Sequence, residues 1–121
     1  MQKRRLVLEA EQRLPLRPAN FAVLSSLAQG PRAGFEVLEF VNNTQPNSGL
    51  LGPGTLYRLL RELRQDGLIE RAQTPDADAS GDERRTYSEL TPLGRAVMLA
   101  EAARLRRTFE AAGLLGLLGE A

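Results

Sequence analysis

The chain has 121 residues and a formal net charge of +1, and it contains neither cysteine nor histidine. Without cysteine a disulfide framework and thiolate metal sites are excluded, and without histidine the commonest general base and metal ligand are missing. We therefore expect one domain that is not an enzyme and holds no metal or cofactor. No apolar run approaches the ~20 residues of a membrane span, and the N-terminus is charged, so we expect a cytoplasmic protein.

The N-terminal part of the chain favours helices. Residues 1–12 place apolar side chains at helical spacing, and nothing breaks the pattern before Pro15. The basic run at residues 3–5 is compatible with phosphate contact, with a role in a dimer or with neither. Pro18 suits the first turn of the next helix, whose apolar stripe stops at Gly30.

A further helix is predicted over residues 33–44. It is expected to bury Phe35, Leu38 and Val41, which recur at helical spacing. Residues 42–49 are dense in turn formers and end it.

The helix predicted over residues 55–66 is the most informative element. Thr55 can cap it, and one stripe is apolar: Leu56, Leu59, Leu60 and Leu63. At about 100° per residue, the opposite face and its flanks collect polar side chains: Arg58, Arg61, Gln65, Tyr57 and Arg64. An apolar back with an arginine-rich front is typical of a helix that faces a polyanion. The alternative is a solvated face on which Arg58 pairs with Glu62.

Two strands are predicted next, over residues 68–72 and 85–90, joined by a long polar loop over 74–82. Arg84 and Arg85 lie where the chain returns, and basic residues there can contact phosphates or the minor groove. The loop is acidic through Asp76, Asp78, Asp82 and Glu83. We expect its tip to lie away from a duplex, because phosphates would repel these carboxylates, or to be disordered, while the base of the wing makes the contacts.

The last predicted helix begins with Thr91 as its cap and Pro92 in its first turn, and it runs to about Gly113. One face suits the core of the domain: Leu93, Ala96, Val97 and Ala100. A second face repeats at spacings of 4, 3, 4 and 3, as in the seam of a helix pair: Met98, Ala102, Leu105, Phe109 and Ala112. We expect this seam to form a homodimer. Packing against the same chain, or lining a ligand pocket, is the alternative.

These elements predict a mostly α-helical fold with a small β-hairpin, a winged helix-turn-helix domain followed by a long dimerisation helix. The expected divisions are an N-terminal helical arm over 1–15, the winged domain over 16–91, and the dimerisation helix and tail over 92–121. The apolar, glycine-broken stretch 114–119 is expected to fray or to dock on a partner.

Four blocks of residues resemble the PadR family of bacterial transcription regulators. They are Gly30-Pro31 followed by Gly34-Phe35-Glu36-Val37, then Pro53-Gly54-Thr55-Leu56-Tyr57, then Arg84-Arg85-Thr86-Tyr87, and finally Leu90-Thr91-Pro92-Leu93-Gly94. The resemblance covers about residues 16–112. It implies a homodimeric repressor that binds a palindromic operator in double-stranded DNA and is released by a small-molecule effector or another signal. Arg58 departs from the family, in which proline is common at that position.

We accordingly predict a DNA-binding regulator with the following contacts: Gly54, Thr55, Tyr57, Arg58, Arg61, Gln65, Arg84 and Arg85. Gly54 and Thr55 are expected to offer backbone N–H and hydroxyl groups to phosphate at the start of the helix. A winged-helix adaptor that binds protein without binding DNA is the main alternative. A small-molecule sensor without DNA affinity is a further one.

Overall fold

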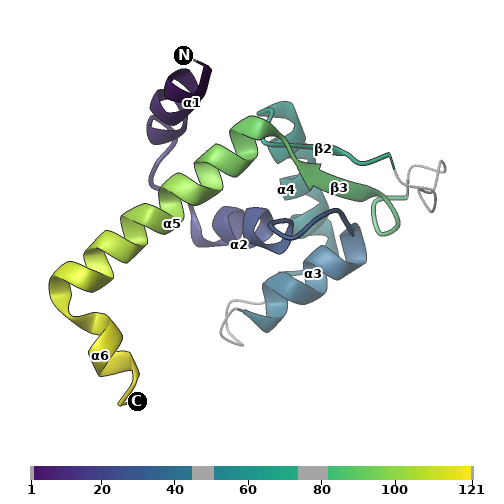
Figure 1. Ribbon diagram of the computed structural model, residues 1–121. Helices are drawn as coiled ribbons and strands as arrows, with labels where there is room; N and C mark the ends of the chain where they lie inside the picture. Colours follow the sequence, from purple (N-terminus) through teal and green to yellow (C-terminus); the bar gives the residue numbers. More distant parts are fainter. Residues whose placement is uncertain (1, 45–50, 74–81, 121) are drawn as a thin grey trace.

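The structure is a computed structural model, and it describes residues 2–44, 51–73 and 82–120 (Figure 1). Its helices are α1 (Gln2–Glu11), α2 (Pro18–Ser26), α3 (Gly34–Asn43), α4 (Pro53–Gln65), α5 (Pro92–Ala112) and α6 (Leu114–Leu118). Its strands are β1 (Arg32–Ala33), β2 (Ile69–Arg71) and β3 (Tyr87–Leu90). The predicted elements occur in the predicted order, with β1 and α6 in addition, and the fold is mostly helical with a small sheet. Asp76 and Asp78 of the predicted acidic loop lie outside the described residues.

The core lies where α2, α3, α4 and the start of α5 meet. Val23, Leu24, Val37, Leu56 and Val97 are fully buried in it. The predicted inner face of α5 is confirmed, because Val97 is buried and its companions pack partly buried against the core: Leu93, Ala96 and Ala100. Helix α1 packs along α5, and Ala10 joins the same core (Figure 1).

The sheet has three antiparallel strands in the order β1-β3-β2, where the sequence predicted two. The additional strand β1 pairs Arg32 with Ser88 and Ala33 with Tyr87. A two-residue strand is too short to show alternation in the sequence, so its pairing depends on tertiary structure. Strands β2 and β3 form the predicted wing, with Ile69 opposite Leu90.

Two predictions at helix starts are wrong. Helix α4 begins at Pro53 with Gly52 at its N-cap, so Thr55 lies within the first turn and does not cap the helix. In α3 the buried positions are Gly34, Val37 and Val41, whereas Phe35 is 53% exposed. Phe35 follows Gly34 by one residue and is turned about 100° away from that stripe.

The predicted ends of α5 are confirmed. The Thr91 side chain accepts a hydrogen bond from the Gly94 backbone N–H at 3.0 Å, and Pro92 occupies the first turn. Gly113 ends the helix in the left-handed conformation, with φ of 68°, which glycine adopts without a steric cost.

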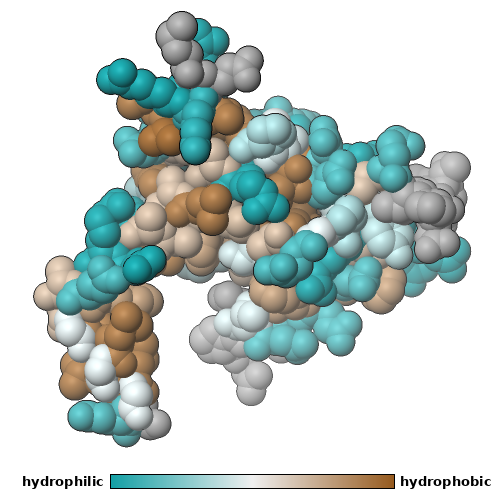
Figure 2. Space-filling model, viewed as in Figure 1, coloured by the Kyte–Doolittle hydropathy of each residue, from teal (hydrophilic) through white to brown (hydrophobic). Residues whose placement is uncertain are grey.

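The second half of α5 and all of α6 extend beyond the body of the molecule (Figure 1). The stretch 114–119, which was expected to fray or to dock on a partner, contains the short helix α6, and none of the residues of α6 is buried. Figure 2 shows hydrophobic side chains along this extension at the lower left, where Leu115, Leu117 and Leu118 are each more than half exposed. Within the described part of the chain, no helix combines the length and apolar character needed to cross a bilayer.

Candidate nucleic-acid interface

Helix α4 has one buried side and one exposed side, as predicted. Leu56, Leu60 and Leu63 are between 0% and 1% exposed, and Leu59 packs partly buried against the core. Most of the predicted contact residues are exposed to solvent: Gly54, Thr55, Arg58, Arg61 and Gln65. The core therefore fixes the orientation of the helix and turns its arginines outward.

The ion pair between Arg58 and Glu62 on the outer side of α4 is loose. Arg58 Nε lies 3.9 Å from Glu62 Oε1, and the two side chains are 67% and 58% exposed. Exposed pairs of this kind contribute between about 0 and 1 kcal/mol, so this interaction costs little to exchange for another anion. The predicted Arg58–Glu62 alternative is therefore present but weak.

Asn42 fixes the approach to α4. Its side-chain amide donates to the Leu51 carbonyl at 3.0 Å and accepts from the Leu51 N–H at 2.8 Å. This pair of bonds joins the end of α3 to the segment that leads into Pro53. It thereby sets the relative position of the two helices of the helix-turn-helix.

The base of the wing is tied to α4 by an ion pair. Arg64 Nη2 lies 2.6 Å from Glu83 Oε1, and the two side chains are only 16% and 17% exposed. Glu83 was predicted to belong to a solvated acidic loop, but it faces the protein instead. The sequence showed the carboxylate and the arginine without showing that they meet across 19 residues.

Tyr57 lies on the same flank of α4 as Arg64. Burial raises the pKa of its phenol, the positive charge of Arg84 lowers it, and Asp82 and Glu83 raise it, so that the net shift is upward. The tyrosine is half-buried and packs against the core. Its ring serves packing at least in part, and it stays a neutral hydrogen-bond donor at physiological pH.

Arg84 and Arg85 are exposed at the base of the wing. The backbone N–H of Arg84 donates to Asp82 Oδ1 at 3.0 Å, and its guanidinium lies 3.4 Å from Asp82 Oδ2. The backbone hydrogen bond from Arg84 has the largest effect on the pKa of Asp82 and lowers it, whereas desolvation raises it. The side-chain hydrogen bond from Arg84 and the charges of Arg84 and Arg85 lower it further, so that the pKa lies below its ordinary value. Asp82 thus organises this turn while Arg84 remains 63% exposed.

Gly34 brings the wing against the start of α3. The N–H groups of Gly34 and Phe35 donate to the carbonyls of Thr86 and Arg84 at 3.1 and 3.0 Å. A Cβ at Gly34 would lie 2.0 Å from the Glu83 carbonyl oxygen, so only glycine permits this approach. This close approach explains the second glycine of the Gly30-Pro31…Gly34 block.

The predicted dimer seam divides into two parts. Met98 is 6% exposed and lies in the core of its own chain. The other four residues are exposed or half-buried towards the free end of α5: Ala102, Leu105, Phe109 and Ala112. Leu99 is 54% exposed on the same helix, although its spacing did not place it in the predicted seam.

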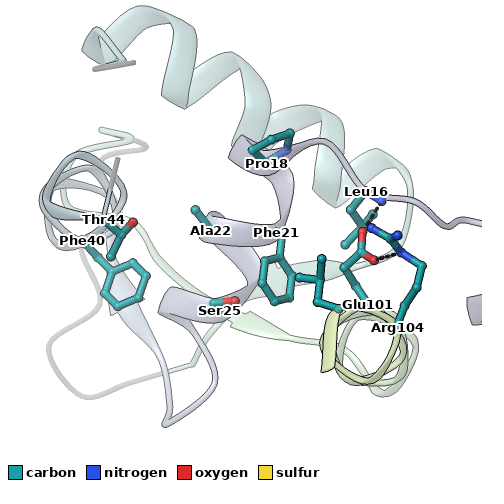
Figure 3. Close-up of a pocket in the computed structure, with 10 residues that line it drawn as sticks. Leu16, Pro18, Phe21, Ala22, Ser25, Phe40, Thr44, Glu101 and Arg104 are labelled. Carbon is teal, nitrogen blue, oxygen red and sulfur yellow. Dashed lines mark hydrogen bonds and ion pairs between the residues drawn. The ribbon is translucent and has the colours of Figure 1, made fainter. Parts of the chain in front are cut away.

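Two hollows flank these elements. One, of about 440 Å³, lies between α2, α3 and α5 and is lined by apolar side chains that include Phe21, Phe40 and Leu105 (Figure 3). Glu101 and Arg104 of α5 close one side of it, and Glu101 accepts a hydrogen bond from the Leu16 N–H at 2.5 Å (Figure 3).

The other hollow, of about 390 Å³, lies between the start of α2 and the outer side of α4, and its lining includes Arg17 and Asn20. Neither hollow was predicted from the sequence, because each is assembled from residues far apart in the chain.

Comparisons with known proteins agree with this architecture. A PadR family transcription regulator from Clostridium difficile R20291 is 21% identical, with a TM-score of 0.62 over 80% of this chain and 96% of that chain. A transcriptional regulator from Clostridium thermocellum is 21% identical, with a TM-score of 0.58 over 78% of this chain and 86% of that chain. Bordetella bronchiseptica BpsR, whose DNA binding is regulated by 6-hydroxynicotinic acid, is 24% identical, with a TM-score of 0.55 over 98% of this chain and 90% of that chain.

A search of curated proteins found no match. The family model of the PadR-like transcriptional regulators matches residues 23–100, which include α3, α4, the wing and the first part of α5. That family consists of transcriptional regulators and is not a family of enzymes. The chain therefore belongs to the PadR-like family of transcriptional regulators.

Proposed function

We propose that this regulator is a homodimeric repressor that reads a palindromic operator through α4 and holds the flanking phosphates through the base of its wing. The observation that carries the proposal is the contrast between the two sides of α4. Its leucines are buried, whereas Arg58, Arg61 and Gln65 face outward without a strong partner among the described residues. An arginine on such a helix can make a bidentate contact to a guanine edge.

Dimerisation is proposed through the free end of α5. This part of the helix extends beyond its own domain and is followed by α6 (Figure 1). It carries Leu105 and Phe109, which are half-buried, and α6 carries exposed leucines. A twofold partner would cover these side chains, and it would present two copies of α4 about 34 Å apart, one turn of DNA.

Release by a small-molecule effector is also proposed, with the hollow of Figure 3 as its binding place. The hollow is largely apolar, and it lies between the helices that position α4 and the helix proposed for dimerisation. The regulation of BpsR by 6-hydroxynicotinic acid supports an effector of similar size. A compound that binds there should raise the melting temperature and release DNA.

The test is a fluorescence anisotropy titration of the purified chain with a duplex from upstream of its own gene. Arg58→Ala and Arg61→Ala should each weaken specific binding by more than about 1 kcal/mol. Arg107→Ala is the matched control, because it removes the same charge from an exposed site on α5. Sedimentation should show a dimer for every variant.

Unchanged affinity in both α4 variants would remove this helix from the proposed role. A chain that binds no duplex at physiological salt would instead fit the protein-interaction adaptor. Repression is tested by deleting the gene, which should raise transcription from the bound promoter.

A further inference from the structure

The hollow beside the start of α2 has a chemical character different from that of the apolar hollow in Figure 3. It has a volume of about 390 Å³, and its lining combines two arginines with uncharged side chains that can form hydrogen bonds. The lining residues are Arg17, Ala19, Asn20, Leu51, Thr55, Arg58, Leu59 and Glu62. Besides Arg58, three of its side chains can donate hydrogen bonds to an anion: Arg17, Asn20 and Thr55.

The hollow lies on the flank of α4 that faces away from the wing. Arg64 marks the wing flank, because it pairs with Glu83 at 2.6 Å. At about 100° per residue, Thr55 and Glu62 lie roughly 160–180° around the helix from Arg64. Arg58 lies between that flank and the outer face, so it borders both the hollow and the proposed reading surface.

The charges of the hollow favour an anion. Arg17 is exposed at the N-cap of α2, and its side chain makes no capping hydrogen bond. The opposing charge is Glu62, which lies 3.9 Å from Arg58 in an exposed pair. Two guanidinium groups against one carboxylate leave the hollow positive, and that carboxylate limits how strongly it can bind.

We infer that this hollow is a binding site for a phosphodiester of the DNA backbone, with Arg17 as its main contact. The inference rests on the proposed function, because it needs a duplex that lies on the outer face of α4. A strand held there would be contacted on the far side of α4 from Arg84, so that the recognition helix is flanked by backbone contacts on both sides. Contacts to phosphate set the register of a protein on DNA and carry no sequence information directly.

The test compares Arg17→Ala with wild type on two duplexes, the upstream sequence and a scrambled sequence of the same length. Anisotropy titrations are run at several salt concentrations between about 50 and 200 mM. Arg17→Ala should weaken binding to both duplexes by the same factor, and it should lower the slope of log affinity against log salt by about 0.9 for each phosphate that it no longer neutralises. Arg17→Lys should keep most of that slope.

Two further variants make the result specific. Glu62→Gln should strengthen binding to both duplexes, because it removes the carboxylate that opposes the two arginines among the described lining residues. Arg107→Ala should leave the salt slope unchanged. Circular dichroism melting checks that each variant is folded.

The outcomes are distinguishable. If wild type binds the upstream duplex but Arg17→Ala changes neither affinity nor slope, the inference is overturned and the proposed function stands. If Arg17→Ala weakens only the upstream duplex, Arg17 contacts bases and the phosphate assignment is overturned. If 10 mM inorganic phosphate (about tenfold over a weak 1 mM site) shifts the melting of wild type and not of Arg17→Ala while no duplex binds, the site takes free phosphate and both proposals fail.

Discussion

The amide side chain of Asn42 bonds to both backbone groups of Leu51, donating to its carbonyl at 3.0 Å and accepting its N–H at 2.8 Å. The two bonds imitate one rung of a β-ladder between the end of α3 and the segment before α4. Because they satisfy the backbone of a half-buried residue, they hold the start of α4 in place.

Asn42→Ala should therefore lower the free energy of unfolding by about 1–3 kcal/mol, since it removes two hydrogen bonds and leaves a partly buried peptide unpaired. Urea denaturation measures the change. Asn43→Ala is the matched control, because Asn43 is exposed at the last residue of α3. Equal unfolding midpoints for the two variants would show that the Asn42 bonds do not stabilise the fold.

The Arg64–Glu83 pair should couple α4 to the wing. In a double-mutant cycle with Arg64→Met and Glu83→Gln, we expect a coupling energy above about 1 kcal/mol, because removing one member leaves the other charged in a mostly buried position. The exposed Arg58–Glu62 pair provides the comparison, with an expected coupling below about 0.5 kcal/mol. Chemical denaturation gives both values. Similar couplings for the two pairs would mean that burial at the wing base adds nothing.

Glu101 should make the stability depend on pH. Burial raises the pKa of this carboxyl, but hydrogen bonds from Arg104 and from the Leu16 N–H, with the charge of Arg104, outweigh it and leave the pKa below its ordinary value. A folded-state pKa below the unfolded value gives stability that is present above the unfolded value and disappears as pH falls through the folded value.

Glu101→Gln should accordingly destabilise the protein by about 1–3 kcal/mol at neutral pH, and the difference from wild type should shrink in acid. Thermal or urea unfolding between about pH 7 and pH 3 measures it. Glu110→Gln on the same helix is the control, because that side chain is 53% exposed in its pair with Arg106. A Glu101→Gln deficit that stays constant down to acid pH would contradict this origin of the stability.

Features that depend on residues close together in the sequence were predictable. The two sides of α4 follow from the spacing of its leucines, and the start of α5 follows from Thr91-Pro92, because helical periodicity and capping act within a few residues. The family resemblance agreed with the order of elements, and the family model that matches residues 23–100 establishes membership.

Features that depend on distant residues were not predictable. Glu83 looked like one acid among several, and only the fold brings it to Arg64. Strand β1 exists because β3 lies beside it. Phe35 was expected inside because it shares a helical spacing with Leu38 and Val41, but Gly34 takes the inward position because the wing carbonyl of Glu83 leaves no room for a side chain there.

Hydroxyl-radical footprinting of the upstream duplex tests most directly whether two recognition helices read one operator. We predict two protected segments centred about 10 base pairs apart on one face of the DNA, related by the symmetry of a palindrome, and both weaker with Arg61→Ala at the same protein concentration. A single protected segment, or protection that persists unchanged in Arg61→Ala, would contradict a dimer that reads DNA through α4.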